Sequence, residues 1–173
     1  MNTVMNEEGM MLSLEDKIDR LWAEREIRNL ALRYAYAVDS RDWPLMESLW
    51  VQSEAPAEGL LDFHLMRTMP VRFKDAGVST LLVANHLIDF DGPDRATGTV
   101  YCHCHAENGV FFEQLICYKD VYERHDGWKF RTRDHLLWWG TEHVSPMKQA
   151  PAHWPASQVG AGSALDMIRR DDG

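Results

Sequence analysis

Apolar residues recur at three- and four-residue steps near the start of the chain, which is typical of one face of an amphipathic helix. The pattern predicts a long helix that begins after Ser13 and ends near Asp39, with Ser13 and Asp16 in a weak capping-box arrangement. The apolar positions that carry this prediction are Ile18, Leu21, Trp22, Ile27, Leu30, Ala31, Tyr34 and Val38.

A second, shorter helix is expected after Asp42, which can cap it, with Pro44 in the first turn. Its apolar side would hold Leu45, Met46, Leu49 and Trp50. Residues 52–78 follow neither the helical nor the strand period clearly. Within them, residues 60–66 are compatible with a short strand, and Pro70 is expected to break any regular element around it.

From Ser79 the pattern becomes that of β-strands, in long segments separated by turn residues. The predicted strands are 80–90, 96–106, 110–124 and 128–139, and the turns lie at 91–94, at Asn108-Gly109 and at Asp126-Gly127. The last three strands should form an antiparallel meander. Helices followed by strands indicate an α+β fold, with helices packed on one face of a curved sheet.

The length of 173 residues fits one domain, and 45% hydrophobic with 26% charged residues are ordinary globular proportions. We expect residues 1–12 to be a flexible lead and residues 13–141 to be the folded domain. Residues 142–173 contain several Pro and Gly and are expected to form an irregular tail, which could cover a pocket or contact another subunit.

Charge and composition narrow the classes of function. A net charge of −9 without a Lys/Arg run argues against nucleic-acid binding, and no apolar stretch reaches the roughly 18 residues of a membrane span. An acidic N-terminus unlike a signal peptide, and three cysteines without zinc-like or CxxC spacing, predict a cytoplasmic protein. Seven Trp, six Phe and five Tyr indicate either a large core or a cavity for a flat apolar ligand.

Several polar residues are candidates for chemistry. Asp39 ends the predicted long helix, where its charge opposes the macrodipole, so it either bonds local backbone or meets a cationic partner in a cavity. Arg133, His135 and Leu137 share one face of the last strand, and Asp39 could supply the counter-charge there. Tyr34 could be aimed at the same pocket if the last helical turn unwinds.

The sequence Cys102-His103-Cys104-His105 raises the question of a metal site. Strand alternation places the two Cys on one face and the two His on the other, which leaves two ligands per face, against three or four in zinc sites. We therefore expect no metal, with the Cys inward and the His outward at a surface or subunit interface. No dinucleotide-binding, P-loop, serine-hydrolase or zinc-protease motif is present in the sequence.

Three stretches together resemble the SnoaL-like branch of the nuclear transport factor 2-like superfamily. They are EREIRNLALRYAYAVDSRDWPLMESLW, VANHLIDFDGPDRATG and YKDVYERHDGWKFRTR, within a resemblance that covers roughly residues 15–140. The resemblance implies a cone-shaped α+β barrel, in which a curved, mostly antiparallel sheet wraps round N-terminal helices and encloses one deep apolar pocket. The family includes polyketide cyclases, dehydratases, an isomerase and a dehydrochlorinase, but also non-catalytic binding modules.

The resemblance also implies roles for particular residues. Asp39 matches the Asp that orients a catalytic His in the dehydratases, Tyr34 matches a Tyr of the bile-acid dehydratase, and Arg133 matches a pocket Arg of the dehydrochlorinase. The family's catalytic His position falls on Leu81, and His86, five residues on, should face the opposite side of its strand. The implied pocket lining is Trp50, Leu81, Cys102, Cys104, Gln114, Ile116, Tyr118 and Leu137, with His64 as a further candidate.

These observations lead to a hypothesis of a cofactor-free lyase or dehydratase, less readily an isomerase, for a small apolar substrate of aromatic or polycyclic type. His135 would be the acid or base and Asp39 its orienter, or Asp39 would be the base if the two do not meet. Arg133 or Tyr34 would stabilise developing negative charge. The alternatives are a non-catalytic binding module or accessory subunit, and an oligomeric scaffold. By resemblance the protein should be a homo-oligomer, a trimer or dimer.

Overall fold

The four predicted strands form one antiparallel sheet in the order β1-β2-β3-β4, in a computed structural model that describes residues 13–74, 77–107 and 111–143. The helices are α1 (Leu14–Ser40), α2 (Trp43–Ser48), α3 (Phe63–Met66) and α4 (Met69–Arg72). The strands are β1 (Ser79–Phe90), β2 (Arg95–Glu107), β3 (Phe111–Arg124) and β4 (Trp128–His143). The expected lead, the Asn108-Gly109 turn and residues 144–173 of the expected tail lie outside the described residues, and the first two residues of that tail, 142 and 143, belong to β4 instead.

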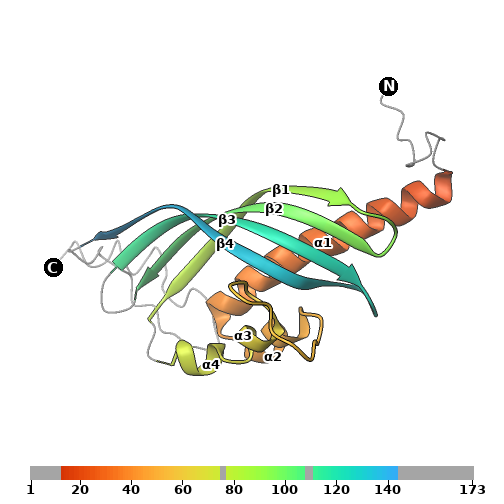
Figure 1. Cartoon of the computed structure of the whole chain (residues 1–173). Coiled ribbons are helices and arrows are strands. Elements are labelled where there is room, and N and C mark those ends of the chain that lie inside the picture. The colour runs from red at the N-terminus through yellow and green to blue at the C-terminus, as the bar shows by residue number, and fades with distance from the viewer. Residues whose placement is uncertain (1–12, 75–76, 108–110, 144–173) are drawn as a thin grey trace, which may run out of the picture.

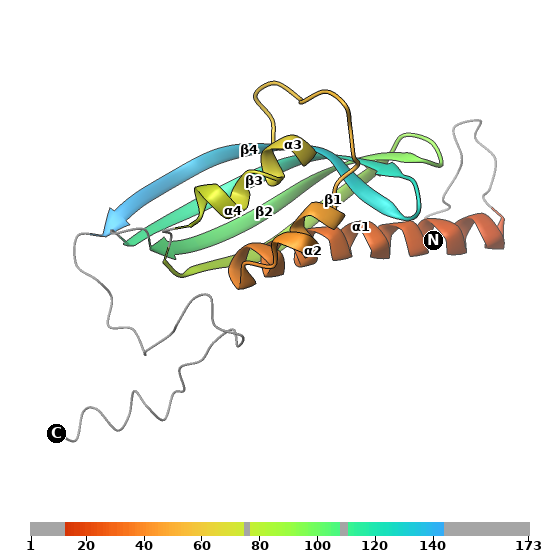
Figure 2. The same ribbon diagram turned by 90° about the horizontal axis from the view of Figure 1, so that it is seen from below.

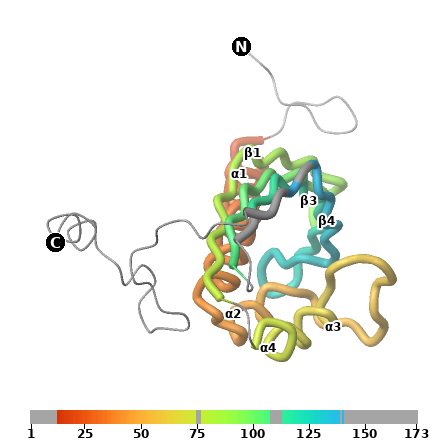
Figure 3. The backbone as a smooth tube through the Cα atoms, turned by 90° about the vertical axis from the view of Figure 1, so that its left-hand side faces the viewer, coloured from red at the N-terminus to blue at the C-terminus, as the bar shows by residue number. Residues whose placement is uncertain are grey.

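The helices cover one face of the curved sheet, as predicted for an α+β fold (Figure 1). α1 runs lengthwise along the sheet, and its first turns project past the sheet's end (Figures 1 and 2). Seen end-on, the sheet curls from β1 to β4 while α2 and α4 lie across its open side (Figure 3). No helix in the described part of the chain is long and apolar enough to span a membrane.

The boundaries of α1 follow local capping chemistry. The Ser13 hydroxyl accepts a hydrogen bond from the backbone N–H of Asp16 at 3.0 Å, and the Asp16 carboxylate accepts one from the backbone N–H of Ser13 at 3.1 Å. This is the predicted capping box, and the helix ends one residue after Asp39. Of the predicted apolar positions, Ile27, Leu30, Ala31 and Tyr34 are buried and Val38 is partly buried, whereas Ile18, Leu21 and Trp22 are 56–66% exposed on the projecting turns.

The short helices confirm the predicted cap of α2 but replace the strand that was predicted over residues 60–66. Asp42 caps α2 by accepting a hydrogen bond from Leu45 N–H at 3.0 Å, as expected. The predicted strand over residues 60–66 is wrong, because Asp62 caps helix α3 there and only Leu61 forms an isolated bridge, with Arg133. Pro70 does not interrupt a helix either: it lies in the first turn of α4, where its missing N–H leaves no hydrogen bond unmade.

A β-bulge in β1 changes which way its side chains face. The register shifts between Ala84 and Leu87, and Asn85 adopts the left-handed conformation with φ 47°. The extra residue turns His86 to the helix-covered face, where its Nε2 lies 3.0 Å from the Tyr122 hydroxyl oxygen. The expectation that His86 faces away from the side of Leu81 is therefore wrong, because strand alternation is interrupted between them.

A buried ion pair joins β3 to β4 at the centre of the covered face. Arg133 Nε and Nη2 donate to the two carboxylate oxygens of Asp120 at 2.7 and 2.8 Å, and neither residue is more than 2% exposed. The guanidinium carbon lies 4.3, 4.0 and 4.5 Å from the ring centres of Tyr34, Tyr118 and Phe130. Burial by itself would lower the pKa of Arg133, but the Asp120 carboxylate outweighs it and raises the pKa, so the guanidinium stays charged.

Replacing Arg133 with Met is expected to destabilise the fold by about 3–5 kcal/mol, because Asp120 would remain buried without its cation. Urea unfolding measures the effect. The matched control is Arg95→Met, which removes an exposed pair with Asp91 at 3.7 Å and should change stability by no more than about 1 kcal/mol. A loss below about 1 kcal/mol in Arg133→Met would contradict a structural role for the ion pair.

Candidate functional site

A cavity of about 220 Å³ lies between the covered face of the sheet and the helices. Every helix and strand contributes to its wall, and most of the lining side chains are apolar. The lining residues are Tyr34, Val38, Trp43, Met46, Leu61, Met66, Met69, Phe73, Ser79, Leu81, Cys104, Ala106, Gln114, Ile116, Tyr118 and His135. A concave apolar site with a few polar groups is the usual form of a small-molecule site.

Seven of the side chains singled out in the sequence lie in this wall, namely Tyr34, Leu81, Cys104, Gln114, Ile116, Tyr118 and His135. Sequence reasoning missed the floor that comes from residues 61–73, because that stretch showed no clear period. Its Met66 and Met69 join Met46 of α2 against the cavity. The clustering of methionines in residues 46–69 was the available signal, since Met commonly lines adaptable apolar sites.

Three of the expected pocket residues lie in the core behind the wall. Trp50 and Cys102 are at most 1% exposed and do not line the cavity. Trp50 packs at 4.9 Å between ring centres against Phe130. Arg133 is held by Asp120, so the expectation that Asp39 supplies its counter-charge is wrong. Because both guanidinium hydrogen bonds to the carboxylate are internal, Arg133 acts on the cavity only through its field.

Two further expected residues also lie outside the cavity lining. His64 Nε2 is 2.7 Å from the carbonyl oxygen of Ser53, so its ring ties down the chain that leads into α3. Leu137 is 50% exposed on β4, beyond the last lining residue of that strand. The cavity does not extend as far as Leu137. Strand alternation predicts which face a side chain is on, but not how far along the strand a cavity extends.

Asp39 lies directly behind the cavity wall, between the lining residues Val38 and Leu81 in space. Its two carboxylate oxygens accept a hydrogen bond from the backbone N–H of Leu81 at 3.2 and 3.1 Å. Burial raises the pKa of Asp39 to about 6, although the Leu81 N–H and the Arg41 guanidinium both oppose the rise. The Arg41 side chain is itself engaged by the carbonyl oxygens of Val38 and Gly77.

His135 reaches the cavity from the opposite edge strand, β4, and its side chain is exposed to solvent at the rim. Partial burial, together with the nearby Arg133 cation, lowers the pKa of His135. Its ring lies edge-on to Tyr118 with 5.5 Å between ring centres. Among the described residues, no hydrogen bond or ion pair joins His135 to Asp39, so the two groups act separately.

The remaining polar groups of the wall are neutral at physiological pH. Burial raises the pKa values of the phenols of Tyr34 and Tyr118, which leaves them as hydrogen-bond donors and not as bases. Burial, and next the negative charge of Asp39, raises the pKa of Cys104 to about 11. Burial raises the pKa of Cys102 to about 12. Neither thiol is therefore ionised enough to act as a nucleophile.

The arrangement offers one carboxylate that titrates near neutrality, one rim imidazole and two buried phenols around an apolar space. Such a set can move a proton at a carbon or oxygen atom and can donate hydrogen bonds to a developing anion. It offers no ionised thiol for covalent catalysis and, within the described wall, no cluster of metal ligands.

Comparison with known proteins shows which family the chain resembles and which solved structures share its fold. The model of the SnoaL-like domain family matches residues 19–134. None of the curated proteins compared with the chain matches it. Several solved structures, by contrast, share its fold.

The crystal structure of hexachlorocyclohexane dehydrochlorinase LinA-type3 from Novosphingobium barchaimii LL02 is similar with a TM-score of 0.67 and 21% identity, over 78% of this chain and 99% of that one. A putative scytalone dehydratase from Novosphingobium aromaticivorans DSM 12444 has a TM-score of 0.64 and 19% identity, over 75% and 93%. A putative dehydratase of the NTF2-like family from Streptomyces avermitilis has a TM-score of 0.54 and 15% identity, over 71% and 98%. With the family match covering most of the chain, the protein belongs to the SnoaL-like domain family.

Proposed function

We propose that the protein is a cofactor-independent lyase that removes a proton from a small apolar substrate, aromatic or polycyclic, and expels a leaving group. The observation that carries the proposal is the half-buried Asp39 carboxylate, with a pKa raised to about 6, directly behind the wall of an apolar cavity. A general base works best when its pKa lies near the operating pH, and an ordinary Asp is about two units too acidic.

The proposed step uses the groups that the cavity brings together. The Asp39 carboxylate takes a proton from the carbon next to the one that bears the leaving group. The electrons of that C–H bond form a carbon–carbon double bond, and the leaving group departs with its own bonding pair, as a halide ion or as a hydroxide ion that takes a proton from solvent to become water. The protonated Asp39 then returns its proton to solvent. For this step the Asp39 carboxylate must leave the backbone N–H of Leu81 and reach the substrate, since Asp39 does not itself line the cavity.

The phenols of Tyr34 and Tyr118 and the imidazole of His135 would assist by donating hydrogen bonds. A lowered pKa keeps His135 neutral near pH 7, so it serves as a hydrogen-bond donor to the leaving group or to an oxyanion. The buried Arg133 cation beneath both tyrosine rings adds a positive field behind any negative charge that develops there. The dehydrochlorinase and the putative dehydratases that share the fold support elimination chemistry by analogy.

A second candidate function is that of a non-catalytic module that binds an apolar ligand. Two observations favour it: Leu81 stands where the resemblance implies a catalytic His, and the Arg that the resemblance places in the pocket is held here in a buried ion pair with Asp120, outside the cavity lining. An absorbance assay without metal or cofactor separates the two. The panel holds aromatic and polycyclic compounds with β-hydroxyl, β-halide or hydroxymethyl groups, since elimination extends their conjugation and creates a long-wavelength band. Binding that raises the melting temperature without any such band would favour the module.

Asp39→Asn is expected to lower kcat/KM for a turned-over compound by about 10²–10⁴-fold, because the amide cannot accept the proton. In the wild type, kcat/KM should rise with pH through about 6 and then level off, as the carboxylate loses its proton. Asp19→Asn, an exposed change on the projecting part of α1, is the control. Activity of Asp39→Asn within tenfold of wild type would refute Asp39 as the base.

The same substitution should leave the fold as stable as wild type, or more stable, at pH 7.5. The pKa of Asp39 is raised on folding, so its contribution to stability is present at low pH and is lost as pH rises between about 4 and 6. Above that range the wild type keeps a half-buried charge that Asn lacks, while the Asn side-chain oxygen can still accept from Leu81 N–H. Urea unfolding at several pH values tests this: the advantage of Asn should grow from pH 4 to pH 7, and a constant difference would contradict it.

The oligomeric state, the role of the tail and the cytoplasmic location stay predictions. Light scattering on the full chain checks for the expected trimer or dimer.

Deletion of the tail after His143 should change ligand affinity if the tail covers the cavity mouth. Equal affinity of the truncated and full chains, measured with the same compound, would end that idea.

A further inference from the structure

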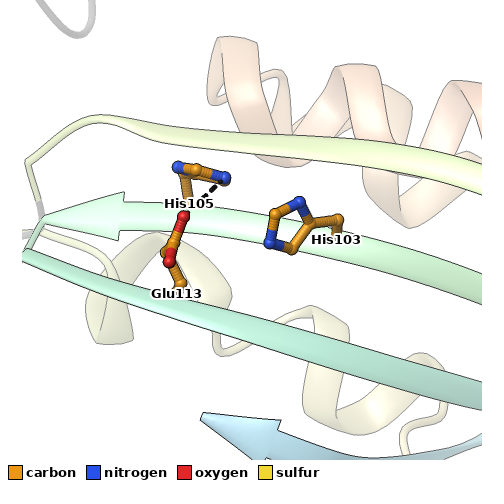
Figure 4. A group of neighbouring side chains, drawn as sticks. All are labelled: His103, His105 and Glu113. Carbon is orange, nitrogen blue, oxygen red and sulfur yellow. Dashed lines mark ion pairs between the residues drawn. The ribbon is translucent and has the colours of Figure 1, made fainter. Parts of the chain in front are cut away.

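The uncovered face of the sheet, opposite the helices, carries a compact group of His103, His105 and Glu113 (Figure 4). Strand alternation places both imidazoles of β2 on this face, and Cys104 between them faces the cavity. In the register of the sheet, His105 lies directly opposite Glu113 of β3. The sequence argument counted only two ligands per face because it considered one strand, and strand pairing supplies the third.

The three side chains already lie close to a ligating arrangement. One ligand atom from each, a ring nitrogen of either His and a carboxylate oxygen, lies within 4.8 Å of the other two. His105 Nε2 and Glu113 Oε1 are 3.2 Å apart, and the two imidazole ring centres are 4.6 Å apart at 75°. All three residues are half-buried, so side-chain freedom is already restricted before any ion binds.

We propose that His103, His105 and Glu113 form a binding site for a divalent transition-metal ion of the zinc class. Two imidazoles and one carboxylate are a ligand set that Zn²⁺ and similar ions bind, with water or another donor in the remaining position. Bonds of about 2.0–2.2 Å in tetrahedral geometry bring neighbouring donors to about 3.3–3.6 Å. Each donor therefore needs to move by about 1 Å or less, which small side-chain rotations within their rotamer wells provide.

The surroundings favour a site that is partly shielded from water. In the register, His103 is opposite Leu82 of β1 on one side and Leu115 of β3 on the other. Apolar neighbours limit solvent access around a metal and strengthen its bonds to the ligands. Hard, oxygen-preferring ions such as Mg²⁺ and Ca²⁺ gain little from two imidazoles, so the ligand set selects for zinc-like ions.

The location of the proposed site on the sheet indicates that the metal ion has a structural role. It lies across the thickness of β2 from Cys104, on the opposite side of the sheet from the cavity, so it does not contact a substrate. It joins β2 to β3 directly behind the wall that Cys104 and Gln114 form, and these two residues are themselves paired in the register. The ion is therefore a cross-strand clamp, and the proposal stands independently of the lyase hypothesis.

The test uses the untagged full chain, freed of metal with a chelator and then titrated with Co²⁺ as a visible probe for zinc-like ions. We expect one Co²⁺ ion to bind per chain and to show the visible d–d absorption bands of a Co²⁺ ion in a low-symmetry site. Zn²⁺ should displace the Co²⁺ and should raise the melting temperature of the protein. His105→Gln and Glu113→Gln should each weaken Co²⁺ binding by at least about tenfold. Melting temperatures in chelator equal to that of the wild type would show that both variants are folded.

The matched control is Glu123→Gln. It changes another His–Glu pair, at the end of β3, where His125 Nε2 and Glu123 Oε2 are 3.3 Å apart. Among the described residues, no third metal-ligating side chain joins this pair. This variant should bind Co²⁺ like the wild type. The proposal is overturned if the wild type binds no Co²⁺ or Zn²⁺, or if His105→Gln and Glu113→Gln bind as tightly as the wild type. It is equally overturned if Glu123→Gln alone abolishes binding.

Discussion

The buried ion pair between Arg133 and Asp120 is the interaction around which the rest of the structure is arranged. It joins β3 to β4, and its guanidinium supports the rings of Tyr34 and Tyr118, which form one end of the cavity. The backbone of Arg133 also exchanges two hydrogen bonds with Leu61, which attaches the segment leading into α3. Arg133 thus contacts the sheet through Asp120, the long helix through Tyr34 and the segment before α3 through Leu61.

The ion pair continues into a hydrogen-bonded chain that ends on β1. The Tyr122 hydroxyl donates to Asp120 at 2.6 Å, so its oxygen accepts from His86 Nε2, and His86 must carry its proton there. Burial lowers the pKa of His86 to about 4, which keeps the ring neutral. This series of hydrogen bonds includes the His86 imidazole, to which the family resemblance gave no role. It is a structural element at the far side of the ion pair from the cavity.

The structural role of Asp39 and its raised pKa have the same origin. Its carboxylate satisfies the outward N–H of Leu81 on edge strand β1, which ties the end of α1 to the sheet. The same position withdraws it from water and raises its pKa to about 6. A carboxylate held in this way is poorly solvated and basic, which is the condition that proton abstraction from carbon requires. The unfavourable helix dipole at Asp39 is thereby offset by the Leu81 backbone donor, with the Arg41 cation as a second, electrostatic contribution.

Local patterns in the sequence predicted two of the helices and all four strands in their correct order, but not α3 and α4. Hydrophobic period, capping residues and turns sufficed for α1, α2 and four strands, because these signals are local. It also placed Tyr34, Cys104, Gln114 and His135 on faces that meet the cavity. The partner of Arg133, the direction of His86 and the third residue of the group with His103 and His105 became apparent only from the folded arrangement. Those outcomes depend on a bulge and on strand register, which bring together residues whose separation along the chain carries no local signal.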